Sequence, residues 1–245
     1  MSRAEALSPA QRRSIIRDGL AVGVATGAYG VSFGALAVAS GLGVAQTCAM
    51  SLLMFTGASQ FAMVGVVASG GAPLSGVLTA LLLGTRNTLY GLRMAPLLGW
   101  HGWRRVGAAH ILIDESTAMS VNRKSTPAAR IGFLSTGLSI FVLWNLATLL
   151  GALAGRAIGD PRTYGLDSAV GGAFLALVWP RLRTTTNRIV GVLAAALALG
   201  LVPVTASGVP VLCAGLVALV AGAVVRRPDP SEIPSSDDVP GGRHG

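Results

Sequence analysis

The chain has 245 residues, of which 52% are hydrophobic and only 12% are charged, and 33 are glycine. This composition is typical of a packed helical membrane protein, where small residues let helices approach closely. The net charge of +9 would suggest a nucleic-acid-binding protein if the chain were soluble. The arginines cluster at the ends of apolar runs, however, so we expect them to orient the chain in a lipid bilayer, with no nucleic-acid partner.

The first part of the chain divides into a polar arm and a long uncharged run. Residues 1–18 are polar and contain several arginines, and we expect a cytoplasmic arm without the features of a cleaved signal peptide. Residues 19–71 contain no charged side chain, and the run is long enough for two membrane crossings and some broken helix. Cys48 and Cys213 both lie in apolar runs, so we expect no disulfide, no metal site and no cofactor.

A polar interruption at Thr56 to Phe61 falls inside this uncharged run. Gly57 favours a helix break between Thr56 and Gln60, and Ser59 and Gln60 would then face the interior of the bundle. One interpretation is hydrogen bonding between helices, worth about 0.6 kcal/mol per contact. The other is a discontinuous helix whose freed backbone groups bind a substrate, as in many transporters. The residue types alone do not separate the two.

Residues 74–98 begin as an apolar helix that is then interrupted by Arg86, Asn87, Tyr90 and Arg93. On a helix, Arg86, Tyr90 and Arg93 share one face. A charge in an apolar span costs about 2.5–3.5 kcal/mol on insertion scales, so such residues usually face a protein interior or a water-filled path. Because apolar residues continue beyond Arg86, we favour a polar face inside a bundle. The alternative is that the bilayer ends near this point and the arginines snorkel to the headgroups.

A second polar segment lies at residues 106–121. His110, Asp114 and Thr117 follow one another at helical spacing and would share one face, whereas Glu115 points elsewhere. The segment is short for a full crossing, which indicates a half-helix. A connector that rests on the membrane surface is the alternative.

Arg86 needs a partner if it lies within the membrane, because a guanidinium is not deprotonated at accessible pH. The carboxylates in the apolar core of the sequence are Asp114 and Glu115, whereas Asp160 and Asp167 fall at a turn and at the start of a later span. We therefore predict that Arg86 and one of Asp114 and Glu115 line the same internal cavity, close enough to interact directly or through water.

The rest of the chain alternates between basic loops and apolar spans. Residues 131–157 form a long span, and residues 226–245 form a polar tail that we expect to be disordered. Between them lie a Gly-Asp-Pro turn at 159–161 and three further spans, one opened by Asp167 and the others at 189–202 and 209–225. Basic loops fall at 100–105, 122–130 and 181–188.

A faint internal repeat relates two parts of the transmembrane region 19–225, at 19–98 and 130–225. The matches, at one common offset, are Gly57-Ala58 with Gly172-Ala173, and Gly76-Val77-Leu78 with Gly191-Val192-Leu193. Loops that are neutral in one half are basic in the other, so the halves would be inverted, since basic loops stay in the cytoplasm. The basic arm at the start fits only if the first span is broken or re-entrant. This topology places Arg104, Arg105 and 181–188 inside, and turns at Gly70 and Pro203 outside.

Four motifs in this order resemble the AzlC-type branched-chain amino-acid permeases over residues 19–225. They are VSFGALAVASGLG from Val31, MSLLMFTGASQF from Met50, TRNTLYGLRMAP from Thr85 and ILIDESTAMS from Ile111. That family usually has Asn-Leu-Arg-His where this chain has Gly84 to Asn87, and Thr-Asp-Glu where it has Ile113 to Glu115. Arg86, Asp114 and Glu115 therefore carry over, but a histidine at position 87 does not. The resemblance implies export of branched-chain amino acids such as valine across the bacterial inner membrane, alongside a small AzlD-type membrane subunit.

We therefore predict an all-α, polytopic membrane protein, a bundle of about seven or eight helical segments with at least one discontinuous helix. Its predicted function is transport rather than catalysis, with proton coupling through the carboxylates as one option. A structural or channel-forming subunit of a membrane complex is the alternative. A zwitterionic substrate needs a cation or helix N-terminus for its carboxylate and a carboxylate or carbonyls for its ammonium. Arg86 fits the first need and Asp114 or Glu115 the second, with Phe61 and Met63 lining an apolar pocket. The predicted substrate-binding residues are Gly57, Ser59, Gln60, Phe61, Arg86, Asn87, Tyr90, Asp114 and Glu115.

Overall fold

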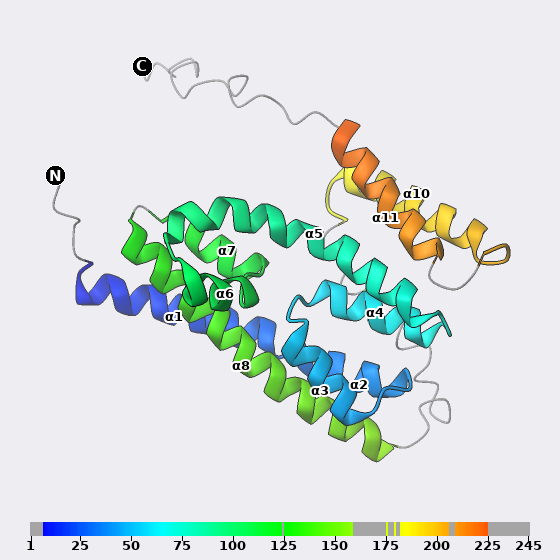
Figure 1. Ribbon diagram of the computed structural model, residues 1–245, viewed down its shortest axis with the longest axis horizontal. Helices are drawn as coiled ribbons and strands as arrows, with labels where there is room; N and C mark the ends of the chain where they lie inside the picture. Colours follow the sequence, from blue (N-terminus) through cyan, green and yellow to red (C-terminus); the bar gives the residue numbers. More distant parts are fainter. Residues whose placement is uncertain are drawn as a thin grey trace, which may run out of the picture.

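A computed structural model of the chain describes residues 7–123, 125–158, 182–205 and 209–224, together with Leu175 and Trp179. The regular elements of these residues are all helical, which confirms the predicted all-α fold (Figure 1). The helices are α1 (Pro9–Gly27), α2 (Gly30–Ala39), α3 (Val44–Leu53), α4 (Ala58–Ala68), α5 (Pro73–Leu98), α6 (Gly102–His110), α7 (Asp114–Val121), α8 (Thr126–Ile158), α10 (Thr185–Leu201) and α11 (Val209–Val224). The predicted tail at 226–245 and the turn at 159–161 lie outside the described residues, as does Asp167.

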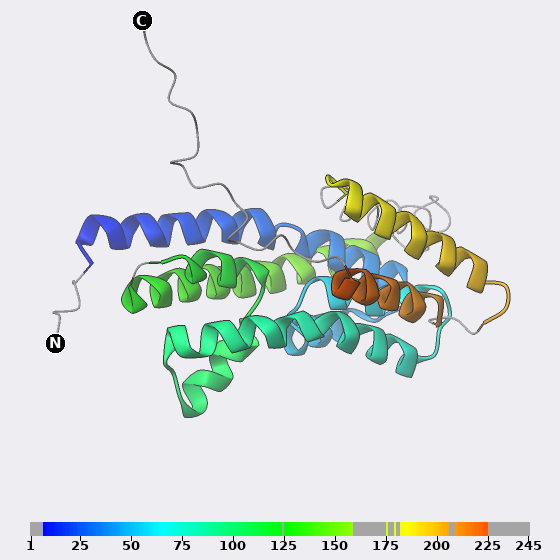
Figure 2. The ribbon, with the colours of Figure 1, turned by 90° about the horizontal axis from the view of Figure 1, so that it is seen from above.

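The long helix α8 runs through the centre of the bundle, and α1 and α2 pack along it one after the other (Figure 2). Glycines make this contact close. A side chain at Gly34 would overlap the carbonyl oxygen of Thr148, and one at Gly151 would overlap that of Val31. Within the described residues, Pro9–Ala39 and Thr126–Ala157 are the helical stretches that are both long and apolar enough to cross a membrane. The two spans therefore approach closely at these glycines, and between them large side chains such as Phe33 and Trp144 stack in the core.

Helices α3 and α4 form a hairpin that reaches only to the middle of α8. Along α3, the hydroxyl of Ser51 lies 3.4 Å from that of Thr148. Beyond the end of α3, the ring of Phe55 meets the ring of Phe141 edge-on at 5.1 Å. Phe141 stands near the midpoint of α8, so the hairpin turns back there. Helix α4 then returns antiparallel to the first half of α5, to which it packs.

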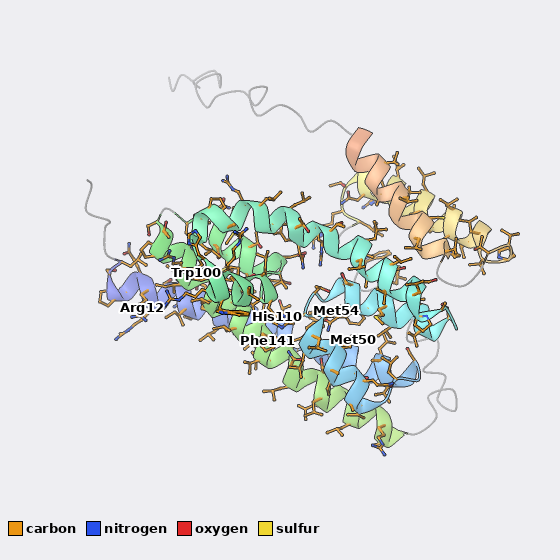
Figure 3. All side chains as sticks on the ribbon, viewed as in Figure 1. Arg12, Met50, Met54, Trp100, His110 and Phe141 are labelled. Carbon is orange, nitrogen blue, oxygen red and sulfur yellow. The ribbon has the colours of Figure 1, made fainter. Side chains whose placement is uncertain are left out.

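Helices α6 and α7 lie at the opposite end of the bundle, where α7 packs on α8 and α5 whereas α6 has no buried residue. We call this pair the second hairpin. Its start lies by the first turns of α8, where the ring of Trp100 is 6.0 Å from that of Phe133. Its far end again reaches Phe141, whose ring lies 5.4 Å from that of His110 (Figure 3). Helix α7 then returns toward the start of α8, and the carbonyl of Met119 comes so close to Gly132 that a Cβ there would overlap it.

Both hairpins are half as long as a membrane is thick. Helices α3, α4, α6 and α7 have 10, 11, 9 and 8 residues. At 1.5 Å per residue each spans about 12–17 Å, against about 30 Å for the hydrocarbon core. The single half-helix expected at 106–121 is wrong, because the segment is divided between the two short helices α6 and α7. The break at residues 111–113 means that His110 does not share a helical face with Asp114 and Thr117, which corrects that prediction.

Basic residues gather at one end of the bundle, where α1 and α8 begin and α5 ends. Arg130 donates from Nε to the carbonyl of Leu98 at 2.8 Å and stacks over Trp100, so it closes the end of α5. Figure 3 shows Arg12 at this same end as Trp100. The opposite end has uncharged turns at 40–43 and 69–72, and Arg156 near the end of α8. The basic arm and the basic 100–105 loop therefore lie on one side of the molecule.

Helices α10 and α11 pack against each other, and α11 contacts the first half of α5, where Gly215 lies against the side chain of Leu82. Figures 1 and 2 show α10 running in the direction opposite to α5. These two helices carry the matched segments that begin at Gly76 and Gly191, so their directions agree with an inverted repeat. Gly172 and Ala173, on which the other match depends, lie outside the described residues, and the repeat stays a prediction.

Candidate functional site

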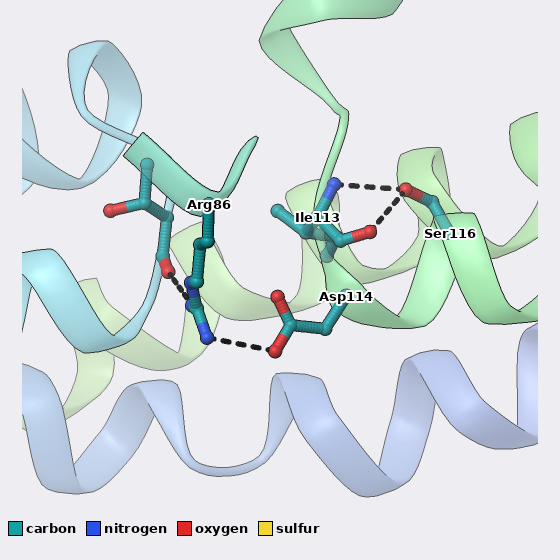
Figure 4. Close-up of polar contacts among 5 residues, drawn as sticks. Arg86, Ile113, Asp114 and Ser116 are labelled. Carbon is teal, nitrogen blue, oxygen red and sulfur yellow. Dashed lines mark hydrogen bonds and ion pairs between the residues drawn. The ribbon is translucent and has the colours of Figure 1, made fainter. Parts of the chain in front are cut away.

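One arginine connects the tips of the two hairpins. Arg86 stands at the midpoint of α5, and its Nη1 donates to Oδ2 of Asp114 at 2.9 Å. Its Nη2 donates to the carbonyl oxygen of Thr56 at 3.4 Å (Figure 4). The two charged side chains are 27% and 31% exposed. The predicted proximity of Arg86 and Asp114 is confirmed, and the inward direction of Arg86 favours the bundle interior over snorkelling.

The first break, at residues 54–57, is built around Gly57 and Gln60. Gly57 has φ of +63°, a conformation that favours glycine, and it starts α4. The side-chain oxygen of Gln60 accepts from the backbone N–H of Gly57 at 3.1 Å, and its Nε2 donates to the carbonyl of Met50 at 3.4 Å. Ser59 is 1% exposed and Gln60 is fully buried. The predicted break and the inward direction of both side chains are confirmed, although α3 already ends at Leu53.

The second break, at residues 111–113, uses a serine for the same purpose. The hydroxyl of Ser116 accepts from the backbone N–H of Ile113 at 3.0 Å. It donates to the carbonyl of Ile111 at 2.9 Å or to that of Ile113 at 3.1 Å. Ser116 and Gln60 therefore hold the same position, the third residue of a half-helix. Asp114 is the first residue of α7, where a carboxylate is favoured by the helix dipole.

Several polar atoms around Arg86 are buried and have no hydrogen-bond partner in the described part of the chain. They come from both breaks and from α5: Oγ1 of Thr56, Oγ of Ser59, Nε of Arg86, Oδ1 of Asn87 and Oγ1 of Thr117. Leaving a buried polar group unpaired costs about 1–3 kcal/mol, so native proteins contain few of them. Three further atoms of this kind lie on α8: Oγ1 of Thr136, Nε1 of Trp144 and Oδ1 of Asn145. The group on the elements that meet at Arg86 indicates a place where a polar ligand or water completes the structure.

The other predicted site residues lie around this centre in different ways. Phe61 packs in the core, with its ring 5.3 Å from that of Phe33 and 6.2 Å from that of Trp144. Tyr90 packs beside the second hairpin, against a buried cluster that includes Ile111, Leu112 and Met94. Glu115 is half-buried next to Asp114, and Asn87 is half-buried next to Arg86. The apolar pocket expected at Phe61 and Met63 stays a prediction.

Residues 21–158 of the chain match the family model described as AzlC protein. The match covers more than half of the chain. The chain belongs to the AzlC family. Within the described residues, the matched region contains the last seven residues of α1 and all of α2 to α8, and so both helix breaks and the Arg86–Asp114 pair.

The AzlC chain also has relatives that are each named an uncharacterized membrane protein. One from Helicobacter pylori is 28% identical over 64% of this chain and 70% of the relative. Another, from Haemophilus influenzae, is 27% identical over 53% of this chain and 54% of the relative. One from the archaeon Archaeoglobus fulgidus is 31% identical over 62% of this chain and 67% of the relative. No solved structure matches the chain. The family and these membrane-protein relatives support a transporter-like role in a membrane.

Sequence reasoning missed three residues of the AzlC site. Ser116 and Thr117 were not predicted as site residues, because the prediction relied on the neighbouring acids. For Ser116 there was a signal, since a polar side chain three residues after Ile113 is typical of a capped helix start. Thr56 contributes through its carbonyl, which no side-chain pattern reveals. The break at 111–113 also lacks a glycine, so only Ser116 marked it.

Proposed function

We propose that this AzlC protein is a transporter that exports branched-chain amino acids, such as valine, across the bacterial inner membrane. The observation that carries the proposal is Arg86, which bonds to the tips of two half-membrane hairpins and pairs with Asp114. Discontinuous helices that meet near the bilayer midplane are where many transporters bind substrates, because their freed backbone groups are available there.

The charges at this centre suit a zwitterion. The α-carboxylate of an amino acid matches the guanidinium of Arg86, and the α-ammonium matches the carboxylate of Asp114. An amino acid that bonds to both replaces their mutual ion pair without leaving either charge alone in a low-dielectric site. A small apolar side chain would then lie among the neighbouring aliphatic and aromatic residues, which supports a branched-chain substrate. Protons could couple to transport through Asp114 or Glu115.

The proposed orientation follows from the basic end of the bundle. Arginines flank membrane spans on the cytoplasmic side, so the end with Arg104, Arg105 and Arg130 faces the cytoplasm. The hairpin α6–α7 then enters from the cytoplasm and α3–α4 from outside. A small AzlD-type membrane subunit is the proposed partner, and it would pack beside these helices in the bilayer.

Counterflow of labelled valine in proteoliposomes tests the function, with and without the small subunit. The full chain should accumulate label against preloaded valine, and Arg86→Gln should abolish this. Arg93→Gln is the matched control, because Arg93 lies on the same helix but is exposed. Saturable exchange supports a transporter, whereas unsaturable flux would indicate a channel. No flux in either preparation would indicate a structural subunit and overturn the proposal.

A further inference from the structure

The two half-helices that begin at the breaks differ in the charge of their first turn. Helix α7 begins with Asp114 and Glu115, so its own carboxylates face the partial positive charge of its N-terminus. Helix α4 begins with Ala58, Ser59 and Gln60 and has no acidic residue in its first turn. The N-terminus of α4 is therefore the one that its own sequence leaves uncompensated.

A buried hydroxyl marks this same N-terminus. Ser59 is 1% exposed, and its Oγ is buried without a hydrogen-bond partner. It faces α5 at Gly84, where a Cβ would lie 3.8 Å from the hydroxyl oxygen. Serine hydroxyls normally find a partner when buried, so this orphaned group is a second sign that a ligand belongs here.

More donors converge on the same break. Helix geometry leaves the backbone N–H groups of Ala58, Ser59 and Gln60 without intrahelical acceptors. Arg86, two residues beyond Gly84 on α5, already reaches the break through its bond to the carbonyl of Thr56, and its Nε is buried and unpaired. Backbone N–H groups, a hydroxyl and a guanidinium together form the donor set that a carboxylate prefers.

We infer that the N-terminus of α4, with the hydroxyl of Ser59 and the guanidinium of Arg86, is the subsite for the α-carboxylate of the substrate. This assignment rests on the proposed function and adds an orientation to it: the carboxylate lies toward α4 and the ammonium toward Asp114 on α7. Ser59 is then a specificity-determining residue that separates amino acids from amines and amides of the same shape.

Ligand binding to the purified full chain, followed by thermal unfolding in detergent, tests the assignment with three probes. Valine carries both charged groups, valinamide lacks the carboxylate, and isovalerate lacks the ammonium. Ser59→Ala should weaken valine and isovalerate roughly tenfold or more, as expected for loss of a hydrogen bond to a charged group, and leave valinamide unchanged.

Ser51→Ala is the matched control, because it removes another buried hydroxyl from the same hairpin, one that pairs with Thr148. It should leave the ranking of the three probes unchanged. If Ser59→Ala weakens all three probes equally, or none of them, the carboxylate subsite is wrong even though valine binds. If the parent chain binds isovalerate but not valine, the subsite holds and the proposed substrate is wrong. If the parent chain binds neither, both are overturned.

Discussion

The hairpins α3–α4 and α6–α7 each contain a helix break, and the two breaks are capped alike but differ in backbone conformation. In each, a chain that enters the bundle must stop, reverse and start a new helix at the centre, and the side chain at the third helical position caps the new start. Gln60 does this for Gly57, and Ser116 does it for Ile113. The backbones differ, since Gly57 has φ of +63° whereas Ile113 is extended with φ of −131°.

Charge separates the two breaks more than geometry does. The first offers a neutral helix start with unpaired donors, and the second offers a carboxylate at its helix start. Arg86 stands between them and bonds to both. The comparison teaches that a similar backbone arrangement occurs twice with different charge, neutral at the first break and anionic at the second, and the proposed carboxylate and ammonium subsites rest on this difference.

The largest expected effect concerns the ends from which the hairpins enter. In a background with Cys48 and Cys213 replaced by alanine, a single cysteine at Arg104 or at Ala72 is tested with a membrane-impermeant thiol reagent. We expect labelling of intact cells at position 72 alone, and of inverted membranes at position 104 alone, because the two turns lie at opposite ends of the bundle. Labelling of both positions from the same side would contradict the prediction that the two hairpins enter from opposite sides of the membrane.

The ion pair that joins the hairpins gives the next largest effect. Arg86→Gln and Asp114→Asn should each destabilise the protein, because removing one partner of a buried pair costs about 3–5 kcal/mol. Partial exposure of 27% and 31% places the effect toward the lower end of that range. The double variant should recover membrane abundance on immunoblots better than either single variant, without recovering valine counterflow. Normal abundance and parental transport in both single variants would refute a shared role for the pair.

The two caps can be compared directly. Gln60→Leu and Ser116→Ala each leave buried backbone groups unpaired, and each should lower the free energy of unfolding by about 1–3 kcal/mol. Gln46→Leu is the control, since Gln46 makes the same cap to Gly43 at 2.8 Å but is exposed. Chemical unfolding in detergent measures all three, and an equal loss for Gln46→Leu would show that burial of the breaks does not matter.

The smallest expected effect belongs to a glycine away from the breaks, Gly107, and it is compared with that of Gly57 at the first break. Gly57→Ala should cost about 1–3 kcal/mol, because an alanine is strained at its φ of +63° while its methyl group meets nothing within 4 Å. Gly107→Ala, in the second hairpin, should instead stabilise α6 by about 0.5–1 kcal/mol, since this glycine is helical and also faces open space. The midpoint temperature of thermal unfolding should fall for Gly57→Ala and rise for Gly107→Ala. Stabilisation by Gly57→Ala would mean that the first break does not need its glycine.

Local chemistry explains which parts of the site could be predicted. Gly57 and Gln60 predicted a break, because glycine adopts backbone conformations that end a helix and a buried amide needs hydrogen-bond partners. Charge alone could pair Arg86 with one of Asp114 and Glu115, since a cation inside an apolar span needs an anion, but it could not choose between the two. The break at Ile111 to Ile113 could not be found this way, because three apolar residues favour continuation of a helix.

The arrangement of the two hairpins depends on tertiary packing, which the sequence pattern does not predict. The sequence indicated broken spans, but not that two hairpins would meet from opposite ends at Phe141, because that depends on which glycines of α8 admit a neighbouring backbone. Gly132 and Gly137 admit the second hairpin, through the carbonyls of Met119 and Ile111. The spacing of these two glycines does not predict this contact, since it depends on which backbone packs against them.

The pairing of Arg86 with Asp114 also has an electrical consequence. The two charges cancel at the midpoint of α5, and an amino acid zwitterion carries no net charge either. Moving one elementary charge through a membrane potential of 100 mV corresponds to about 2.3 kcal/mol. Loading this pair with a zwitterion adds no charge on which the potential can act. Any voltage dependence of transport would therefore report a coupling ion, or the ionisation of Glu115, and not the amino acid itself.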